Sequence, residues 1–205
     1  MKNIYTIGYS GFDINDFIVV LKKYKINVLV DVRSNPCSKI YRDYNKTYLQ
    51  EHLSKNNIIY RNYKDEFGAR QEDMQYFTDG YLDFSKYVKS EMFLNGIKKI
   101  EEGMKRGYIF ALMCAEKDPS TCHRSILVAR RFHDLGYSVK NILSDGSYEL
   151  QEDIEQRLVE KYFPDRNQLS LFSDIMSWES MVNKSYEYRN AEIGYRNEEI
   201  GVTVL

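Results

Sequence analysis

The chain has 205 residues, of which 43% are hydrophobic, and a formal net charge of −1. This hydrophobic content suffices for one good core, and the near-neutral charge excludes a globally basic nucleic-acid coat while leaving room for a local basic patch. Three cysteines without the paired spacing of small secreted frameworks fit a reducing interior better than a disulfide scaffold. Because the first residues lack a signal-peptide design and no apolar run approaches about 18 residues, we expect a soluble cytoplasmic protein without a membrane partner.

Strands and helices are predicted to alternate along the first half of the chain. The run INVLVDV at 26–32 is almost continuously apolar and β-branched, which is typical of a strand covered on both faces in a parallel sheet. The segment 64–80 is polar without a clear period and predicts a long loop of the sort that covers a site. The expected elements here are strands at 3–7, 26–32 and 58–63, and helices at 12–24, 46–54, 81–89 and 93–106.

The alternation continues through the second half until Pro164. The run YIFALMC predicts a fourth strand, and Gly136 is a plausible stop for the helix that follows it. The expected elements here are strands at 108–114 and 139–143, and helices at 122–135 and 148–162.

Strands that alternate with helices imply right-handed crossovers and therefore parallel strands. We predict an α/β domain over residues 1–163 with three layers, in which helices flank a mostly parallel sheet of about five strands. After Pro164, Asn, Glu, Ser and Tyr replace Leu, Val and Ile. Residues 164–205 are therefore predicted to form a polar, Tyr-rich C-terminal extension with a helix around 176–188.

Polar and reactive residues gather where the predicted strands end. Open α/β sheets bind ligands just beyond the carboxyl ends of their strands, and residues far apart in the sequence converge there. We therefore predict one site at this edge. Its expected members follow the five strands in order, namely Gly8, Tyr9 and Ser10, then Asp31, Arg33, Ser34 and Cys37, then Tyr60, Arg61 and Tyr63, then Cys114 and Glu116, and finally Asp145.

Four of these edge and loop residues are candidates for catalysis. Cys114 would be a stabilised thiolate if it faces a helix N-terminus and Arg124, and Glu116 is a candidate general acid or base. His123 could act as a base toward Cys114 or a substrate. Asp31 could take part in the chemistry or simply pair with backbone amides or with an arginine. The other three also have structural alternatives: a small buried thiol for Cys114, a solvated loop charge for Glu116, and a helix cap or a bond to a carbonyl for His123.

Arg124 would lie in the first turn of a helix, where a cation is locally unfavourable. Its position suggests an anionic partner such as phosphate or carboxylate, with an internal salt bridge as the alternative. The spacing of Cys114, Cys122 and His123 matches no common zinc pattern, so we expect neither a metal site nor a cofactor. The residues expected to bind substrate are Gly8, Tyr9, Ser10, Arg33, Ser34, Cys122, Arg124 and Asp145.

Four segments occur in the order TIGYS, LVDVRSNPCS, LMCAEKDPSTCHR and SDG. Over about residues 3–150 the chain resembles the domain of unknown function 488 family, and the Cys-Ala-Glu…Cys-His-Arg element is the most specific part. Members more often have His where this chain has Tyr9. The resemblance implies an α/β domain but no established reaction, and a shared polar site on Gly8, Ser10, Asp31, Arg33, Ser34, Cys114, Glu116, Cys122, His123 and Arg124.

A weaker resemblance links the layout to rhodanese-like sulfurtransferases and their phosphatase relatives. In those enzymes a cysteine lies in a tight loop whose amides cradle the transferred sulfur or an oxyanion. The loop from Cys114 to Arg124 is too long for that cradle and contains Pro119, which has no amide hydrogen. The resemblance therefore concerns the layout, and the longer loop puts the cradle mechanism in doubt.

The extension contains the pentapeptide QLSLF at 168–172. It resembles the motif with which many bacterial DNA polymerases and repair factors dock on the replication sliding clamp. In that interpretation Gln168 bonds at the rim, Leu169 belongs to the same anchor, and Leu171 and Phe172 fill an apolar pocket. The alternative is that the apolar residues fold back onto the domain.

Three hypotheses follow, and the sequence leaves open whether the chain is an enzyme. The favoured one is a factor in DNA metabolism or repair that binds DNA or a nucleotide and docks on the clamp. The second is a cysteine-dependent sulfurtransferase or phosphatase-like enzyme acting through Cys114, and the third is a non-catalytic anion-binding adaptor. Under the first, arginines and lysines would contact phosphates and tyrosines would stack on bases. These are Arg33, Lys39, Arg42, Arg61, Arg70, Lys117 and Arg124, with Tyr9, Tyr41, Tyr44, Tyr60 and Tyr63.

Overall fold

A six-stranded sheet forms the centre of the molecule. The computed structural model describes residues 2–166 and 176–197. Its strands are β1 (Asn3–Gly8), β2 (Val28–Asp31), β3 (Ile59–Asn62), β6 (Phe110–Cys114), β7 (Ser138–Ile142) and β8 (Tyr148–Leu150). They lie in the order β3-β2-β6-β1-β7-β8, and all neighbours pair in parallel except β7 and β8, which are antiparallel. The predicted mostly parallel sheet is confirmed.

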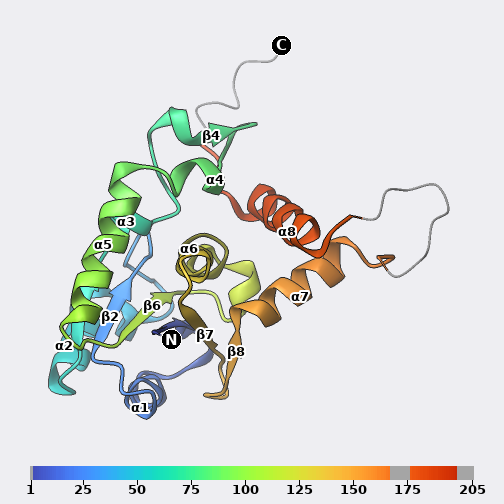
Figure 1. Cartoon of the computed structure of the whole chain (residues 1–205). Helices are drawn as coiled ribbons and strands as arrows, with labels where there is room; N and C mark the ends of the chain where they lie inside the picture. Colours follow the sequence, from blue (N-terminus) through green and yellow to red (C-terminus); the bar gives the residue numbers. More distant parts are fainter. Residues whose placement is uncertain (1, 167–175, 198–205) are drawn as a thin grey trace.

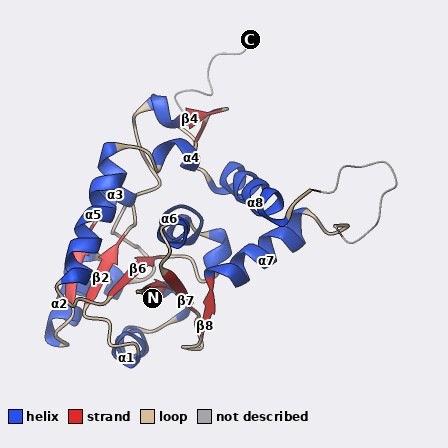
Figure 2. Cartoon of the chain, in the orientation of Figure 1, coloured by secondary structure: helices blue, strands red, loops and turns tan. Residues whose placement is uncertain are grey.

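Helices cover both faces of this sheet, because successive side chains of a strand point to opposite faces. On β2 and β6, Leu29 and Met113 belong to the core on one face, and Val30 and Leu112 belong to the core on the other. Figure 2 shows α1 on one side of the strands and α6 on the other. The predicted three-layer α/β fold is thus confirmed. The longer helices are α1 (Ile14–Lys23), α2 (Lys46–Lys55), α5 (Glu91–Lys105), α7 (Gln151–Tyr162) and α8 (Trp178–Ile193), and α6 (Arg130–Asp134) is short.

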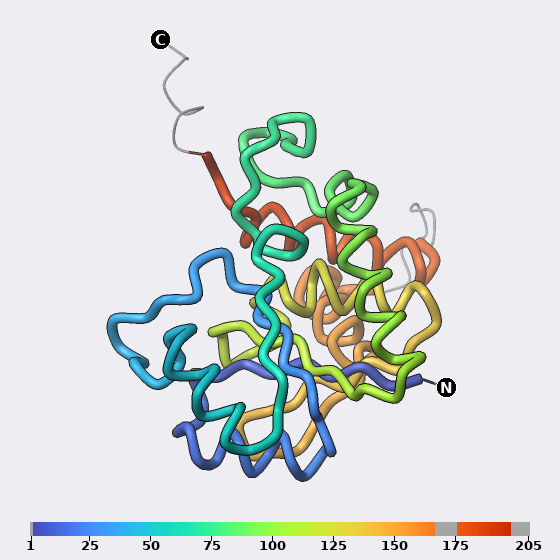
Figure 3. Tube along the Cα trace, turned by 90° about the vertical axis from the view of Figure 1, so that its left-hand side faces the viewer, coloured from blue at the N-terminus to red at the C-terminus, as the bar shows by residue number. Residues whose placement is uncertain are grey.

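The segment predicted as a loop at 64–80 contains regular structure. It forms α3 (Lys64–Phe67), a 3-10 turn, and the strand β4 (Phe77–Thr78), which pairs antiparallel with β5 (Tyr81–Leu82). Asp79 and Gly80 connect the two strands with positive φ angles of 49° and 79°. Asp-Gly is a strong signal for such a hairpin turn, because both positions require left-handed backbone. Figure 3 shows this hairpin and the short helix α4 (Phe84–Tyr87) extending beyond the sheet toward α8.

The two helices predicted after 114 begin differently. The expected helix at 122–135 is a π-helix, η5 (Arg124–Ala129), that continues into α6. The first three residues of the expected helix at 148–162 form β8, which pairs with β7, and α7 begins at Gln151. Gln151 is fully buried and bonds to Asn141 of β7, so tertiary contacts determine this start.

The helix expected around 176–188 is present as α8, which lies beside α7 in Figure 1. Val182 and Tyr186 of α8 belong to the main core, and the side chain of Asn190 bonds to the backbone of Phe84 and of Leu82. The pentapeptide at 168–172 lies outside the described residues. Within the ranges that the structure describes, each helix is too short or too polar to span a membrane.

Candidate functional site

The central strands β2, β6 and β1 bring their carboxyl ends to one edge. Gly8 is the register partner of Cys114, and Asp31 is the partner of Met113. The loop after β6 then stays attached to both neighbours, because the amide of Ser10 donates to the carbonyl of Ala115 at 3.1 Å. The imidazole Nε2 of His123 lies 2.9 Å from the carbonyl of Val32, the residue after Asp31. The predicted convergence of these distant segments is therefore present in the structure.

Gly8 permits a close approach between β1 and the loop after β6. A Cβ atom at this position would lie 1.8 Å from the carbonyl oxygen of Glu116, far inside van der Waals contact. The same carbonyl accepts a 2.6 Å hydrogen bond from Nη1 of Arg124. The absence of a side chain at Gly8 thus lets the Cys-Ala-Glu segment lie directly over the end of β1.

Asp31 is fully buried and its carboxylate is saturated with hydrogen bonds. Arg33 donates to it from its backbone N, its Nε and its Nη2, at 3.1, 2.8 and 2.6 Å. The hydroxyl of Tyr60 donates to Oδ2 at 2.7 Å, and burial together with this carboxylate raises the pKa of Tyr60. A carboxylate with all of its acceptor positions occupied holds the loop after β2 in place. Of the two roles expected for Asp31, its contacts match pairing with an arginine.

One side-chain nitrogen of Arg33 differs from the others in its hydrogen bonding. Its Nη2 also donates to the carbonyl of Tyr44 at 2.9 Å, and its guanidinium lies over the ring of Tyr9, which stacks on Tyr44 at 4.3 Å. Its Nη1 is buried and has no hydrogen-bond partner in the described part of the chain. The arginine is therefore fixed in orientation by its neighbours, while the two N–H bonds of its buried Nη1 lack an acceptor in the described part of the chain.

Two buried thiols, a partly buried imidazole and the carboxylate of an exposed residue form a cluster after β6. The sulfur of Cys114 lies 3.8 Å from Nδ1 of His123, and the sulfur of Cys122 lies 2.8 Å from Oε2 of Glu116. Both cysteines are free and buried. We call these four residues the thiol cluster.

The two thiols of the cluster differ in acidity. The hydrogen bond to Cys122 and burial together raise the pKa of Cys114 well above its usual value. Burial also acts to raise the pKa of Cys122, but the contact with Cys114 and the charges of Arg124 and His123 outweigh it and lower that pKa. Burial raises the pKa of Glu116. The contact with Cys114 and the charge of Arg124 thus favour the thiolate on Cys122, whereas the sequence predicted it on Cys114.

Arg124 is fully buried and bonds to backbone. Besides its bond to Glu116, it reaches the carbonyl of Lys117 from Nη2 at 3.4 Å, and its own amide donates to the sulfur of Cys122 at 3.5 Å. The sequence suggested an anion or an acidic side chain as its partner, whereas the contacts formed are with carbonyl oxygens. Its charge lies beside the thiol cluster and its hydrogen bonds hold the loop.

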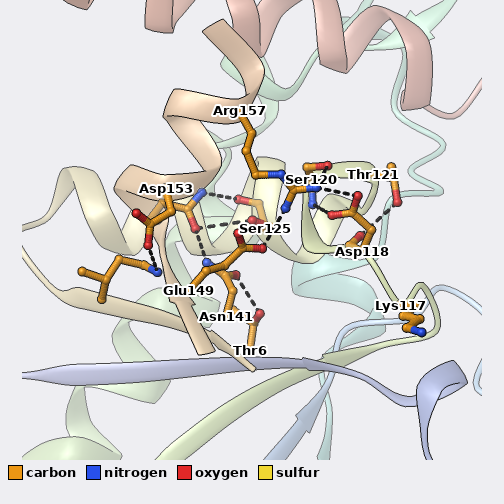
Figure 4. A network of polar contacts seen from close by, with 12 residues as sticks. Thr6, Lys117, Asp118, Ser120, Thr121, Ser125, Asn141, Glu149, Asp153 and Arg157 are labelled. Atoms are coloured by element: carbon orange, nitrogen blue, oxygen red, sulfur yellow. Dashed lines mark hydrogen bonds and ion pairs between the residues drawn. The ribbon is translucent and has the colours of Figure 1, made fainter. Parts of the chain in front are cut away.

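A second network outside the cluster holds the same loop to α7 (Figure 4). Arg157 of α7 donates to Asp118 and to Glu149, each at 2.8 Å, and to the hydroxyl of Ser120 at 3.3 Å. Asp118 also caps the turn before Cys122 by accepting from the amide of Ser120 at 2.9 Å. Sequence reasoning missed Arg157 because no local pattern links it to residues 39 positions earlier, although Asp118-Pro119 is a recognisable cap signal.

The remaining predicted residues divide between the edge and its surroundings. The hydroxyl of Ser34 accepts from the amide of Arg70 at 2.9 Å and so joins the loop after β2 to the segment after α3. Asp145 bonds to the amide and hydroxyl of Ser147 at 2.8 and 2.6 Å, in an exposed contact within the turn after β7. Asp145 therefore has a local turn role in this structure.

The fold and the residues at the carboxyl edge of the sheet together define an α/β protein. The thiol cluster and the fixed side chain of Arg33 lie at this edge, where the central parallel strands end. A family model described as "Domain of unknown function DUF488" matches residues 13–130. The chain belongs to this family. Comparison with curated proteins and with solved structures gave no match.

Proposed function

We propose that the carboxyl edge binds a phosphorylated ligand, a nucleotide or a nucleic-acid strand, and that the protein acts in DNA metabolism or repair. The observation that carries this proposal is Arg33, whose guanidinium is fixed by Asp31 and Tyr44 while Nη1 lacks a partner among residues 2–166 and 176–197. A buried donor without an acceptor costs on the order of 1–3 kcal/mol. A phosphate oxygen at that position would recover this energy through a charge-assisted hydrogen bond.

The neighbouring segment offers the other groups that such a ligand needs. Lys39 and Arg42 are exposed, and Tyr41 is 38% exposed while its ring contacts the edge of the Tyr9 ring at 5.5 Å. Tyrosine faces stack on bases, and exposed cations contact phosphates. Because most of residues 35–43 are exposed, moving this segment to reach Arg33 disturbs few buried contacts.

The binding proposal is tested by fluorescence anisotropy with two labelled probes, a thymidine oligonucleotide and ATP, over a range of salt concentrations. The double change Lys39→Ala with Arg42→Ala should weaken oligonucleotide binding and reduce the salt slope by about 1 to 2. The matched control is Lys98→Ala with Lys105→Ala, which removes the same charge from exposed positions on α5. Wild-type protein that binds neither probe at low salt, or equal weakening by both double changes, would reject the proposal.

Docking on the replication sliding clamp is the second part of the proposal. It rests on the sequence QLSLF, with Gln168 at the rim and Leu171 and Phe172 as apolar anchors. Calorimetry with a purified bacterial clamp should detect binding that Leu171→Ala with Phe172→Ala abolishes. Lys184→Ala on the exposed side of α8 is the control and should leave binding unchanged. Binding that survives the double change would rule out this anchor.

The cysteine-dependent alternative receives less support from the contacts of Cys114. Its sulfur is buried beside Cys122, which raises its pKa and disfavours the nucleophilic thiolate. Alkylation in a Cys37→Ser background, which removes the exposed thiol, tests it directly. Modification of Cys114 with loss of thiosulfate or phosphate-ester turnover would favour this alternative. Binding of a probe without any turnover would favour the non-catalytic adaptor.

A further inference from the structure

The thiol cluster has the composition and spacing of a metal centre. The ligand atoms of Cys114, Cys122 and His123 all lie within 4.8 Å of one another. Zinc bonds sulfur at about 2.3 Å and nitrogen at about 2.0 Å, so tetrahedral coordination places sulfur and nitrogen about 3.6 Å apart. The observed distance between Cys114 Sγ and His123 Nδ1 is 3.8 Å. These two atoms are therefore already close to the separation that one shared zinc ion requires.

The imidazole of His123 is oriented as a metal ligand. Its Nε2 lies 2.9 Å from the carbonyl of Val32, which accepts a hydrogen bond and so assigns the proton to Nε2. The lone pair of Nδ1 then points toward the sulfur of Cys114. A backbone carbonyl that fixes the far nitrogen is the usual support of a metal-binding histidine.

Glu116 lies beside this three-residue set and is not part of it. Its Oε2 is 2.8 Å from the sulfur of Cys122, and the residue is exposed. Three protein ligands leave one position of a tetrahedral zinc site for water or for a carboxylate. The loop from Cys114 to His123 thereby provides three ligands.

A divalent cation would compensate the charge of its own ligands. Both sulfurs are buried, and buried charges without compensation are strongly disfavoured. One divalent ion neutralises the two thiolates that bind it. The amide of Arg124, which donates to Cys122 Sγ at 3.5 Å, is placed to stabilise a metal-bound thiolate.

We propose that Cys114, Cys122 and His123 bind one zinc ion, with Glu116 beside the site. The ion would join the end of β6 to the start of η5 and, through His123, to the loop after β2. The sequence argument against a metal compared the spacing with familiar ligand motifs, and a loop with ligands at 114, 122 and 123 belongs to none of them. The inference does not depend on phosphate binding, since neither Arg33 nor Tyr41 takes part.

The proposal is tested with cobalt as a spectroscopic substitute for zinc. Full-length protein is stripped with a chelator under anaerobic, reducing conditions and titrated with Co²⁺. One equivalent should produce a near-ultraviolet sulfur-to-cobalt charge-transfer band with the intense visible bands of tetrahedral cobalt, and Zn²⁺ should abolish both. Zn²⁺ should also raise the thermal midpoint of the stripped protein. Protein that gives neither spectrum nor shift, or in which Cys114 and Cys122 form a disulfide under these conditions, would overturn the proposal.

Matched variants locate the ligands. Cys122→Ser and His123→Gln should each weaken Co²⁺ binding by more than about 100-fold, because each removes a ligand. Cys37→Ser and His52→Gln change an exposed cysteine and a histidine on α2, and should bind as the wild type does. Equal affinity in ligand and control variants would overturn the proposal. If Cys122→Ser does not fold, the charge-transfer band of the wild type still reports thiolate coordination, and His123→Gln still reports the imidazole.

Discussion

The loops after β2 and after β6 lie side by side, yet their polar groups are satisfied in different ways. After β2, the carboxylate of Asp31 receives three bonds from Arg33 and one from Tyr60, although Nη1 of Arg33 lacks a partner in the described part of the chain. After β6, the thiol cluster has sparser contacts among its own members, including the long 3.8 Å approach of Cys114 to His123. The comparison teaches that location at a ligand-binding edge does not assign a role. A polar group whose hydrogen-bonding positions are all occupied within the protein holds the backbone around it in place. A polar group with an unoccupied position can still bind a ligand.

The largest expected effect on stability comes from removing the carboxylate of Asp31. Asp31→Ala would leave Arg33 buried without its counter-charge, which should lower the free energy of unfolding by about 3–5 kcal/mol. Urea denaturation monitored by circular dichroism measures this change. Asp145→Ala, in the exposed turn after β7, is the control and should have a much smaller effect. A loss for Asp31→Ala no greater than for the control would mean that Asp31 is not a structural anchor.

The contact between β1 and the loop after β6 is tested by Gly8→Ala. The added Cβ would meet the carbonyl of Glu116 at 1.8 Å, so backbone has to move, and such overpacking costs about 1–3 kcal/mol or more. We expect a loss of at least about 2 kcal/mol in the same denaturation experiment. Ser10→Ala, two residues later, should change stability less. If Gly8→Ala has the same free energy of unfolding as the wild type, the loop after β6 moves at little energetic cost.

The network outside the thiol cluster should contribute less. Arg157→Ala removes bonds to Asp118 and Glu149, but Arg157 is partly exposed, so the expected loss is about 1 kcal/mol. The matched control is Lys161→Ala, which breaks the exposed ion pair of α7 with Glu192 and should cost less. If both changes have the same effect, the loop after β6 is held by its other contacts alone.

The smallest effect concerns His133, which pairs with two carboxylates away from the edge and so contrasts with His123. Its nitrogens lie 3.3 Å from Glu152 and 3.5 Å from Glu155, and the bond to Glu155 raises the pKa of His133 above the ordinary 6.5. A raised folded-state pKa gives stability that is complete below about pH 6.5 and is lost as the pH rises through the folded value. His133→Gln should therefore cost less than about 1 kcal/mol at pH 6 and almost nothing at pH 9. A difference from wild type that is the same at every pH would contradict this assignment.

Much of the fold follows from local pattern. The strands were predictable because residues buried on both faces form continuous apolar runs, as at 26–32. The strand β8 and the hairpin β4–β5 were not predicted. Tyr148–Leu150 joins the sheet only because β7 offers an edge, and the Asp-Gly turn at 79–80 follows a stretch without a clear period.

The candidate site was predictable in location but not in pairing. Strand ends of a parallel sheet must meet, so the convergence of Asp31, Cys114 and His123 followed from topology. Which groups pair depends on rotamers and loop paths that a single sequence does not encode locally. Arg124 bonding to carbonyls and Arg157 reaching Asp118 are examples, since each requires knowledge of where the loop after β6 lies.

The packing of α8 on α7 has a consequence for any partner that engages QLSLF. The side chain of Asn190 in α8 forms hydrogen bonds with the backbone of Leu82 and Phe84. The ion pair between Lys161 and Glu192 links α8 to α7. The described helices on either side of the pentapeptide, α7 and α8, thus pack against each other. If the pentapeptide docks on a partner as proposed, that partner would keep the carboxyl edge at a high effective concentration near itself.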